Sequence, residues 1–185
     1  MNNIIYNLVL GMSLIFVQAL FLNNINFLEF LNPFIYIYII IYFPIKNNRP
    51  VFILTAFIYG LLMDLFSDTH GIHSASTLCI AYFRPYLLKL FFGMAYEHQV
   101  VKFNSLKLKQ NIFYLFSMVI IHHIILFSLE VFDLSKINLV FQNVISNSIF
   151  TFLSVFILYE FLMRKSRWEK VYSLYWFFQH LLFLF

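Results

Sequence analysis

Long apolar runs fill most of this chain, and short polar stretches separate them. The runs lie near residues 4–22, 31–45, 51–66, 74–92, 112–129 and 139–163. A helix needs about 20 apolar residues to cross the roughly 30 Å of bilayer hydrocarbon. Of the 185 residues, 62% are hydrophobic and 11% charged, whereas an average soluble domain is about 25% charged. The sequence therefore predicts an all-α integral membrane protein, with about six transmembrane helices forming one bundle over residues 1–163.

The second run is the least regular of the six, because Pro33 and Pro44 bracket it. Proline lacks an amide donor and interrupts a helix. Irregular backbone at membrane depth must be buried in protein, because lipid cannot hydrogen-bond it. We therefore expect a tilted or incomplete helix here, packed against the rest of the protein.

The basic residues predict the orientation of the bundle. Eleven of the twelve Lys and Arg residues fall in alternate connections, toward the end of the fourth run or in the tail, and only Lys136 lies on the opposite side. Cytoplasmic connections retain the excess of basic residues, so we expect both termini inside a multi-pass protein of the cytoplasmic membrane. We interpret these residues as topology signals and expect no nucleic-acid partner. The first run lacks a basic leader and a small-residue cleavage site, so it is expected to be a retained span.

Residues 164–185 form a tail that begins basic and ends aromatic. Its apolar part is about fifteen residues long, or roughly 22 Å as a helix, which is short for a crossing. Trp and Tyr rings favour the membrane interface. The tail is therefore expected to lie along the cytoplasmic interface as an amphipathic segment, and a seventh crossing is the less favoured alternative.

The end of the third run carries a cluster of polar residues. Asp64 stands within the run, and Asp68, His70, Gly71 and His73 follow it. A charge in hydrocarbon is costly, so Asp64 is expected to contact another helix or a partner protein. The pattern favours a polar helix exit, whose acids bond turn amides or the N-terminus of the next helix. A divalent metal site or a proton-handling carboxylate is the alternative.

Two further groups of polar residues lie deep in the apolar runs. His122 and His123 point about 100° apart on a helix, so at most one is expected to face a given site. A neutral histidine bonded across helices is favoured over a haem or metal ligand. In the sixth run one helix face carries polar residues that we expect to bond neighbouring helices, with a substrate channel as the alternative. These residues are Asn143, Asn147, Thr151 and Ser154, flanked by Ser146 and Ser148.

Arg84 and Pro85 lie within the fourth run. Proline bends a helix, and an arginine at this depth can extend to the cytoplasmic surface, so a kink and an anchor explain the pair. A contact between Arg84 and a lipid phosphate is the alternative.

The sequence offers no positive argument for catalysis. It contains no Ser-His-Asp set, no phosphate-binding glycine loop, no dinucleotide fingerprint and no zinc-protease helix. Its single cysteine, Cys79, cannot form a disulfide within the chain. We therefore expect no enzyme activity, no cofactor and no bound metal.

The third and fourth runs carry a motif that resembles the MreD family of rod shape-determining membrane proteins. The motif reads Phe57-Ile-Tyr-Gly60-Leu-Leu-Met-Asp64-Leu-Phe-Ser, followed by Gly71-Ile-His73. The resemblance implies a fold similar to the substrate-binding subunits of energy-coupling vitamin transporters. It also implies that Gly60, Asp64 and Gly71 shape the corner between the third and fourth spans, and that the protein sits in the bacterial inner membrane.

The resemblance further implies a non-enzymatic scaffold of the cell-elongation complex, which supports cell shape and lateral peptidoglycan synthesis. The expected partners are an MreC-like protein, a RodA-type glycosyltransferase with its transpeptidase, and indirectly MreB filaments. Two other functions remain open. One is a substrate-binding transporter subunit that holds a vitamin-like ligand near the outer face, since fold does not determine function. The other is an intramembrane metalloenzyme that uses Asp64, Asp68 and the histidines.

Overall fold

The structure is a computed structural model of the chain, and every described element is helical. It describes residues 3–24, 32–44, 48–98, 101, 103 and 107–182, with side chains described as far as Leu162. The five long helices are α1 (Asn3–Leu20), α3 (Arg49–Ser67), α4 (Ile72–Phe92), α6 (Leu108–Val131) and α7 (Ile137–Leu182). The short ones are η1 (Leu22–Asn24), η2 (Ile35–Ile37), α2 (Tyr38–Ile41), α5 (Met94–Glu97) and η4 (Leu134–Lys136).

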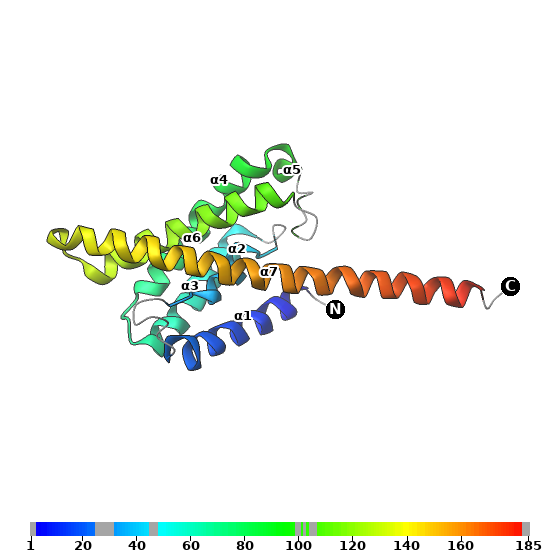
Figure 1. The fold of residues 1–185 in the computed structure, drawn as a ribbon, viewed down its shortest axis with the longest axis horizontal. Coiled ribbons are helices and arrows are strands. Elements are labelled where there is room, and N and C mark those ends of the chain that lie inside the picture. Colours follow the sequence, from blue (N-terminus) through cyan, green and yellow to red (C-terminus); the bar gives the residue numbers. More distant parts are fainter. Residues whose placement is uncertain are drawn as a thin grey trace.

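The long helices pack side by side, and α1 begins on the same side of the molecule on which α7 ends (Figure 1). Three helical segments are long and apolar enough to span a membrane: Arg49–Ser67, Leu108–Val131 and Ile137–Leu162. The apolar part of α1, Tyr6–Leu20, is shorter. The described residues thus form an all-helical bundle that contains three candidate membrane-spanning helices.

The second apolar run is a short irregular segment at the centre of the bundle. We call Asn32–Pro44 the core segment; it contains only η2 and α2. Each residue from Tyr36 to Phe43 is at most 7% exposed, and α1, α4 and α7 all contact η2 or α2. The expectation of an incomplete helix packed against protein is confirmed. A membrane-spanning helix over residues 31–45 is not present, because the two prolines leave only seven helical residues between them.

A tight corner joins α3 to α4. Helix α3 is followed by Asp68 and His70, whose φ angles of 54° and 52° are left-handed, and Gly71 precedes α4 with a φ of 103°. Gly60 lets the two helices approach closely, because a Cβ there would lie 2.8 Å from the His73 carbonyl oxygen and even closer to Ser74 Cα. A larger residue at position 60 would force the helices apart.

Helix α7 continues without a break into residues 164–182 and projects beyond the other helices (Figure 1). It is 46 residues long, which is about 69 Å at 1.5 Å per residue. The boundary at residue 163 therefore does not coincide with the end of a helix. The interfacial position of the tail remains a prediction.

Candidate functional site

Asp64 caps the N-terminus of α4 from the last turns of α3. Its Oδ1 accepts hydrogen bonds from Thr69 Oγ1 at 2.6 Å and from the His73 amide at 2.8 Å, and its Oδ2 accepts one from the Ser74 amide at 2.9 Å. The amides at a helix N-terminus lack partners within the helix and favour a negative charge. Asp64 is 6% exposed, so the carboxylate is engaged inside the protein. Of the two contacts expected for Asp64, the structure places it in the interhelical one.

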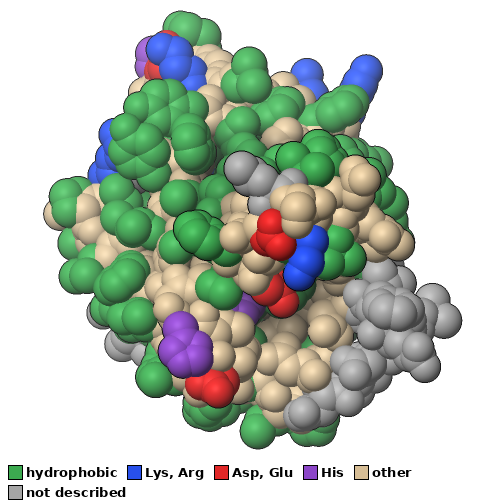
Figure 2. Space-filling view, turned by 90° about the vertical axis from the view of Figure 1, so that its left-hand side faces the viewer, with side chains coloured by type: hydrophobic (Ala, Val, Ile, Leu, Met, Phe, Trp, Pro, Cys, Tyr) green, Lys and Arg blue, Asp and Glu red, His purple; other side chains and the backbone are tan. Residues whose placement is uncertain are grey.

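Two other polar residues of the corner do not bond the Asp64 carboxylate. Asp68 and His70 are exposed in the turn and do not join Asp64. Figure 2 shows the end of the molecule to which this corner belongs, where acidic and histidine side chains gather among polar and backbone atoms. Within the described residues, no group of three His, Cys, Asp or Glu side chains is arranged to hold a metal ion.

Tyr36 of the core segment links two buried histidines. Its hydroxyl lies 2.9 Å from His73 Nδ1 on α4 and 2.9 Å from His122 Nε2 on α6. A hydroxyl has one proton, so it donates to one imidazole and accepts from the other, and the two tautomers are coupled. His122 Nδ1 is buried and has no hydrogen-bond partner among the described residues. This contact ties α4 and α6 to the core segment.

His123 belongs to the same cluster as His122. Both histidines are 0% exposed, and their rings lie 5.3 Å and 6.3 Å from the ring of Phe34, measured between centroids. Their hydrogen bonds nevertheless go to different partners, which agrees with the prediction that at most one would face a given site. His123 bonds its own helix at the Val119 carbonyl and lies 3.3 Å from Thr151 Oγ1 on α7.

The polar face of α7 satisfies the backbone of the core segment. The Asn32 amide donates to Asn147 Oδ1 at 2.9 Å, and the Phe34 amide donates to Thr151 Oγ1 at 3.0 Å. Within α7 itself, the Asn147 side-chain amide donates to the Asn143 carbonyl. Non-helical backbone needs such partners where neither water nor a helix supplies them. Asn147 and Thr151 of this face thus bond the core segment, whereas Ser154 bonds the Phe150 carbonyl of its own helix.

Two further residues, which were not predicted from the sequence, also hydrogen-bond the backbone of the core segment. Gln18 on α1 accepts a hydrogen bond from the Ile35 amide at 2.8 Å and is 0% exposed. Tyr114 on α6 donates to the Ile41 carbonyl at 2.8 Å. An isolated glutamine in an apolar run was a usable signal for an interior contact. Tyr114 is one of twelve tyrosines in the chain, and nothing in the sequence marked it for an interior contact.

Arg84 holds the C-terminal end of the core segment. Its Nε donates to the Ile41 carbonyl at 3.1 Å, and its Nη2 donates to the Phe43 carbonyl. The residue is 4% exposed, so the prediction that its side chain extends to the surface is wrong. The carbonyls of the irregular segment lie within reach and lack helical partners, so they bind the guanidinium inside the bundle. Pro85 follows within α4, which continues through it to Phe92.

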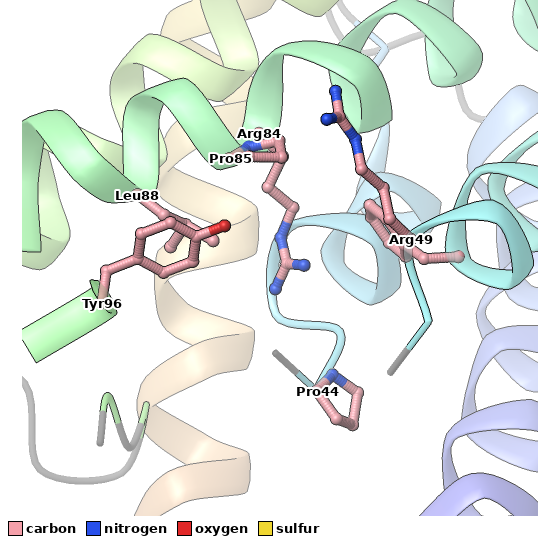
Figure 3. Close-up of a pocket in the computed structure, with 7 residues that line it drawn as sticks. Pro44, Arg49, Arg84, Pro85, Leu88 and Tyr96 are labelled. Atoms are coloured by element: carbon pink, nitrogen blue, oxygen red, sulfur yellow. The ribbon is translucent and has the colours of Figure 1, made fainter. Parts of the chain in front are cut away.

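A cavity of about 160 Å³ adjoins Arg84. It is lined by Pro44, Arg49, Phe52, Arg84, Pro85, Leu88 and Tyr96. Figure 3 shows the Arg84 guanidinium projecting into the middle of this space, above Pro44, whereas the Arg49 guanidinium points the opposite way, toward α4. The Cζ atom of Arg49 accordingly lies 5.4 Å from the ring centroid of Tyr82 on α4.

Two ion pairs lie on the surface of the described part of the protein. Lys89 binds Glu97 at 2.9 Å, and Lys136 lies 3.8 Å from Asp133. Hydrogen bonds from Ser135 lower the pKa of the Asp133 carboxyl below its ordinary value. The hydrogen bond from Lys89 likewise lowers the pKa of Glu97. Neither pair reaches the cavity beside Arg84.

Comparisons with protein-family profiles, curated proteins and solved structures found no match to this chain. Most of the buried polar groups described above bond the backbone of the core segment or the N-terminus of α4, and the buried histidines bond Tyr36 or α7. These hydrogen bonds hold an irregular segment inside the bundle. The Arg84 cavity is the place where a buried charge adjoins open space.

Proposed function

We propose that this protein is a non-enzymatic membrane scaffold of the MreD type, which supports bacterial cell elongation through contacts with other membrane proteins. One observation carries the proposal: the buried polar side chains are directed inward, to the core segment and the α3–α4 corner. Asp64, Arg84, Asn147 and Thr151 each bond backbone groups of the protein itself. The outer surface is left apolar, which suits lateral contact in a bilayer.

The proposed topology has six passes through the bacterial inner membrane, with both termini in the cytoplasm. Five of the passes are helices α1, α3, α4, α6 and α7. The sixth pass is the buried core segment. The eleven-to-one distribution of basic residues supports this orientation. On the MreD resemblance, the fold is similar to the substrate-binding subunits of vitamin transporters.

The proposed partners are an MreC-like protein, a RodA-type glycosyltransferase and its transpeptidase, with MreB filaments reached indirectly. Large apolar side chains recur at every fourth position on the outer face of α7 and are all at least half exposed. They are Phe141, Ile145, Ile149, Leu153, Ile157 and Phe161. The exposed corner residues Asp68 and His70 add polar groups at the end of the bundle where α3 meets α4.

The experiment combines depletion in the host bacterium with purification of the tagged full chain. Depletion is expected to turn rod-shaped cells round, and an MreC-like protein is expected to co-purify. The double variant Asp68→Asn with His70→Asn removes a charge and an imidazole from the corner. Asn tolerates the left-handed backbone at both positions, so the variant should fold and retain less MreC-like protein.

Asp133→Asn is the matched control, because Asp133 is an exposed acid in the other described turn at this end. It should co-purify the MreC-like protein as the wild type does. Cells that stay rod-shaped on depletion, together with a wild-type chain that retains no membrane partner, would contradict the scaffold role.

The transporter alternative requires a site for a vitamin-sized ligand. Such sites commonly measure about 300–1,000 Å³, whereas the cavity beside Arg84 measures about 160 Å³. It also lies at the basic end of the bundle, opposite to the outer face expected for that ligand. A small molecule that stays bound through purification, or association with ATPase subunits, would favour the transporter instead.

A further inference from the structure

Arg84 is a buried cation that the described part of the protein leaves without an anionic partner. Its guanidinium donates to the carbonyls of Ile41 and Phe43 and to Tyr114 Oη, all of which are neutral acceptors. The ring of Phe52 lies 4.8 Å from Arg84 Cζ and adds a cation–π contact. These dipoles hold the group in place, but a buried charge without an opposite charge beside it remains costly.

The guanidinium also adjoins a space of suitable size. The cavity measures about 160 Å³, and one water molecule occupies about 30 Å³ of liquid volume. A phosphate group fits such a space, whereas a whole lipid does not. The planar fork of arginine matches the spacing of phosphate oxygens and binds them through charge-assisted hydrogen bonds. No hydrogen bond from Arg84 Nη1 is found within the described residues, so these donors are available to a ligand.

The position of the cavity favours a lipid as the source of the phosphate. Arg49 at the start of α3 and Lys89 near the end of α4 lie at the basic end of the bundle, where a bilayer places its phosphates. Val51, Tyr86 and Leu90 expose apolar side chains on the outer faces of the same helices, away from the cavity lining. A lipid can thus insert its phosphate while its acyl chains lie against α3 and α4.

We propose that the cavity between α3, α4 and the core segment binds the phosphate of an anionic membrane lipid, with Arg84 as the group that contacts it. Arg49 raises the local positive potential without touching the phosphate, because its guanidinium points away from the cavity (Figure 3). The site does not depend on the scaffold role and would exist equally in a transporter subunit.

Binding is tested on the purified full chain in detergent, with native mass spectrometry as the readout. The probes are phosphatidylglycerol, phosphatidylcholine and inorganic phosphate. Phosphatidylglycerol is expected to be retained in preference to phosphatidylcholine, which has a phosphate but no net negative charge. Millimolar inorganic phosphate should not displace it, because the acyl chains also contribute to binding.

Two variants assign the binding to this cavity. Arg84→Gln is expected to weaken phosphatidylglycerol binding about tenfold, because it removes the charge-assisted hydrogen bonds. Tyr96→Trp narrows the cavity without changing a charge and should also weaken binding, which keeps the test valid if Arg84→Gln fails to fold. Lys89→Gln is the matched control, since this lysine is exposed on the same helix and pairs with Glu97.

The control should change the affinity less than about twofold, as expected for an exposed ion pair. Wild-type affinity in a folded Arg84→Gln protein or in Tyr96→Trp would overturn the proposal. Equal retention of the two lipids would also overturn it. Displacement by inorganic phosphate would assign the cavity to a free anion and reject the lipid as its source.

Discussion

Each end of the bundle buries a charged side chain, but the two side chains have different surroundings. At the α3–α4 corner, the carboxylate of Asp64 accepts from a side chain and two amides of its own chain, which closes the site. At the basic end, Arg84 donates to neutral acceptors and adjoins a cavity. A helix N-terminus supplies several unpaired amides that converge on an anion. The end of an irregular segment supplies two carbonyls, which hold a cation without surrounding it.

The largest effect on stability is expected from Asp64→Ala, which removes the carboxylate at the α3–α4 corner. It leaves the His73 and Ser74 amides without an acceptor, and unpaired buried donors are costly. The free energy of unfolding in detergent should fall by about 3 kcal/mol, and less protein should remain in the membrane. Leu65→Ala, on the lipid-facing side of α3, is the control and should lower stability much less. Unchanged stability in Asp64→Ala would remove the capping role.

Arg84→Met removes the buried cation at the basic end and should lower the free energy of unfolding by a smaller amount, about 1–2 kcal/mol. The Ile41 carbonyl keeps its hydrogen bond from Tyr114, and loss of an unpaired buried charge offsets part of the penalty. The comparison is made by equilibrium unfolding of both variants in the same detergent. A loss of stability equal to that of Asp64→Ala would show that the protein depends equally on the two charged side chains.

Tyr36→Phe tests the link between the two ends, because Tyr36 lies in the core segment between His73 and His122. Removal of the hydroxyl leaves two buried imidazole nitrogens without a partner, so we expect a loss of about 1 kcal/mol. The NMR signals of both histidine side chains should shift together. A shift confined to one histidine would mean that their tautomers are not coupled.

The smallest effect is expected at the exposed turn between α6 and α7. The pKa of Asp133 is lowered by hydrogen bonds from Ser135, so the stabilisation is present above the unfolded pKa of about 3.9. It is lost as the pH falls through the lower pKa of the folded state. Protection of the Ser135 amide hydrogen, relative to its intrinsic exchange rate at each pH, should fall in that acidic range, and it should already be low in Asp133→Asn.

Much of the organisation was predictable from local composition. The apolar runs indicated the positions of α1, α3, α4, α6 and α7, since burial in lipid demands long apolar helices. The prolines around the core segment predicted its irregular backbone. The pairing of Asp64 with the N-terminus of the next helix followed from its place at a helix exit. Function in cell elongation stays a prediction.

Other features depended on contacts between distant parts of the chain, which the spacing of residues in the sequence does not reveal. Arg84 was expected at the surface, but the carbonyls of Ile41 and Phe43 lie within its reach in the bundle. His122 and His123 hydrogen-bond different partners, as expected, but no spacing indicated that the ring of Phe34 lies beside both. The roles of Gln18 and Tyr114 depend on a segment that approaches them only after folding.

The sequence by itself determined that this chain is helical, that it is too apolar for water, and where its polar interruptions fall. Those properties follow from the solvent that each residue prefers. Only the tertiary structure decided which backbone groups the polar side chains satisfy. An irregular segment at the centre of the bundle must find its hydrogen bonds among whichever helices surround it, and the set of neighbours is a property of the packed molecule.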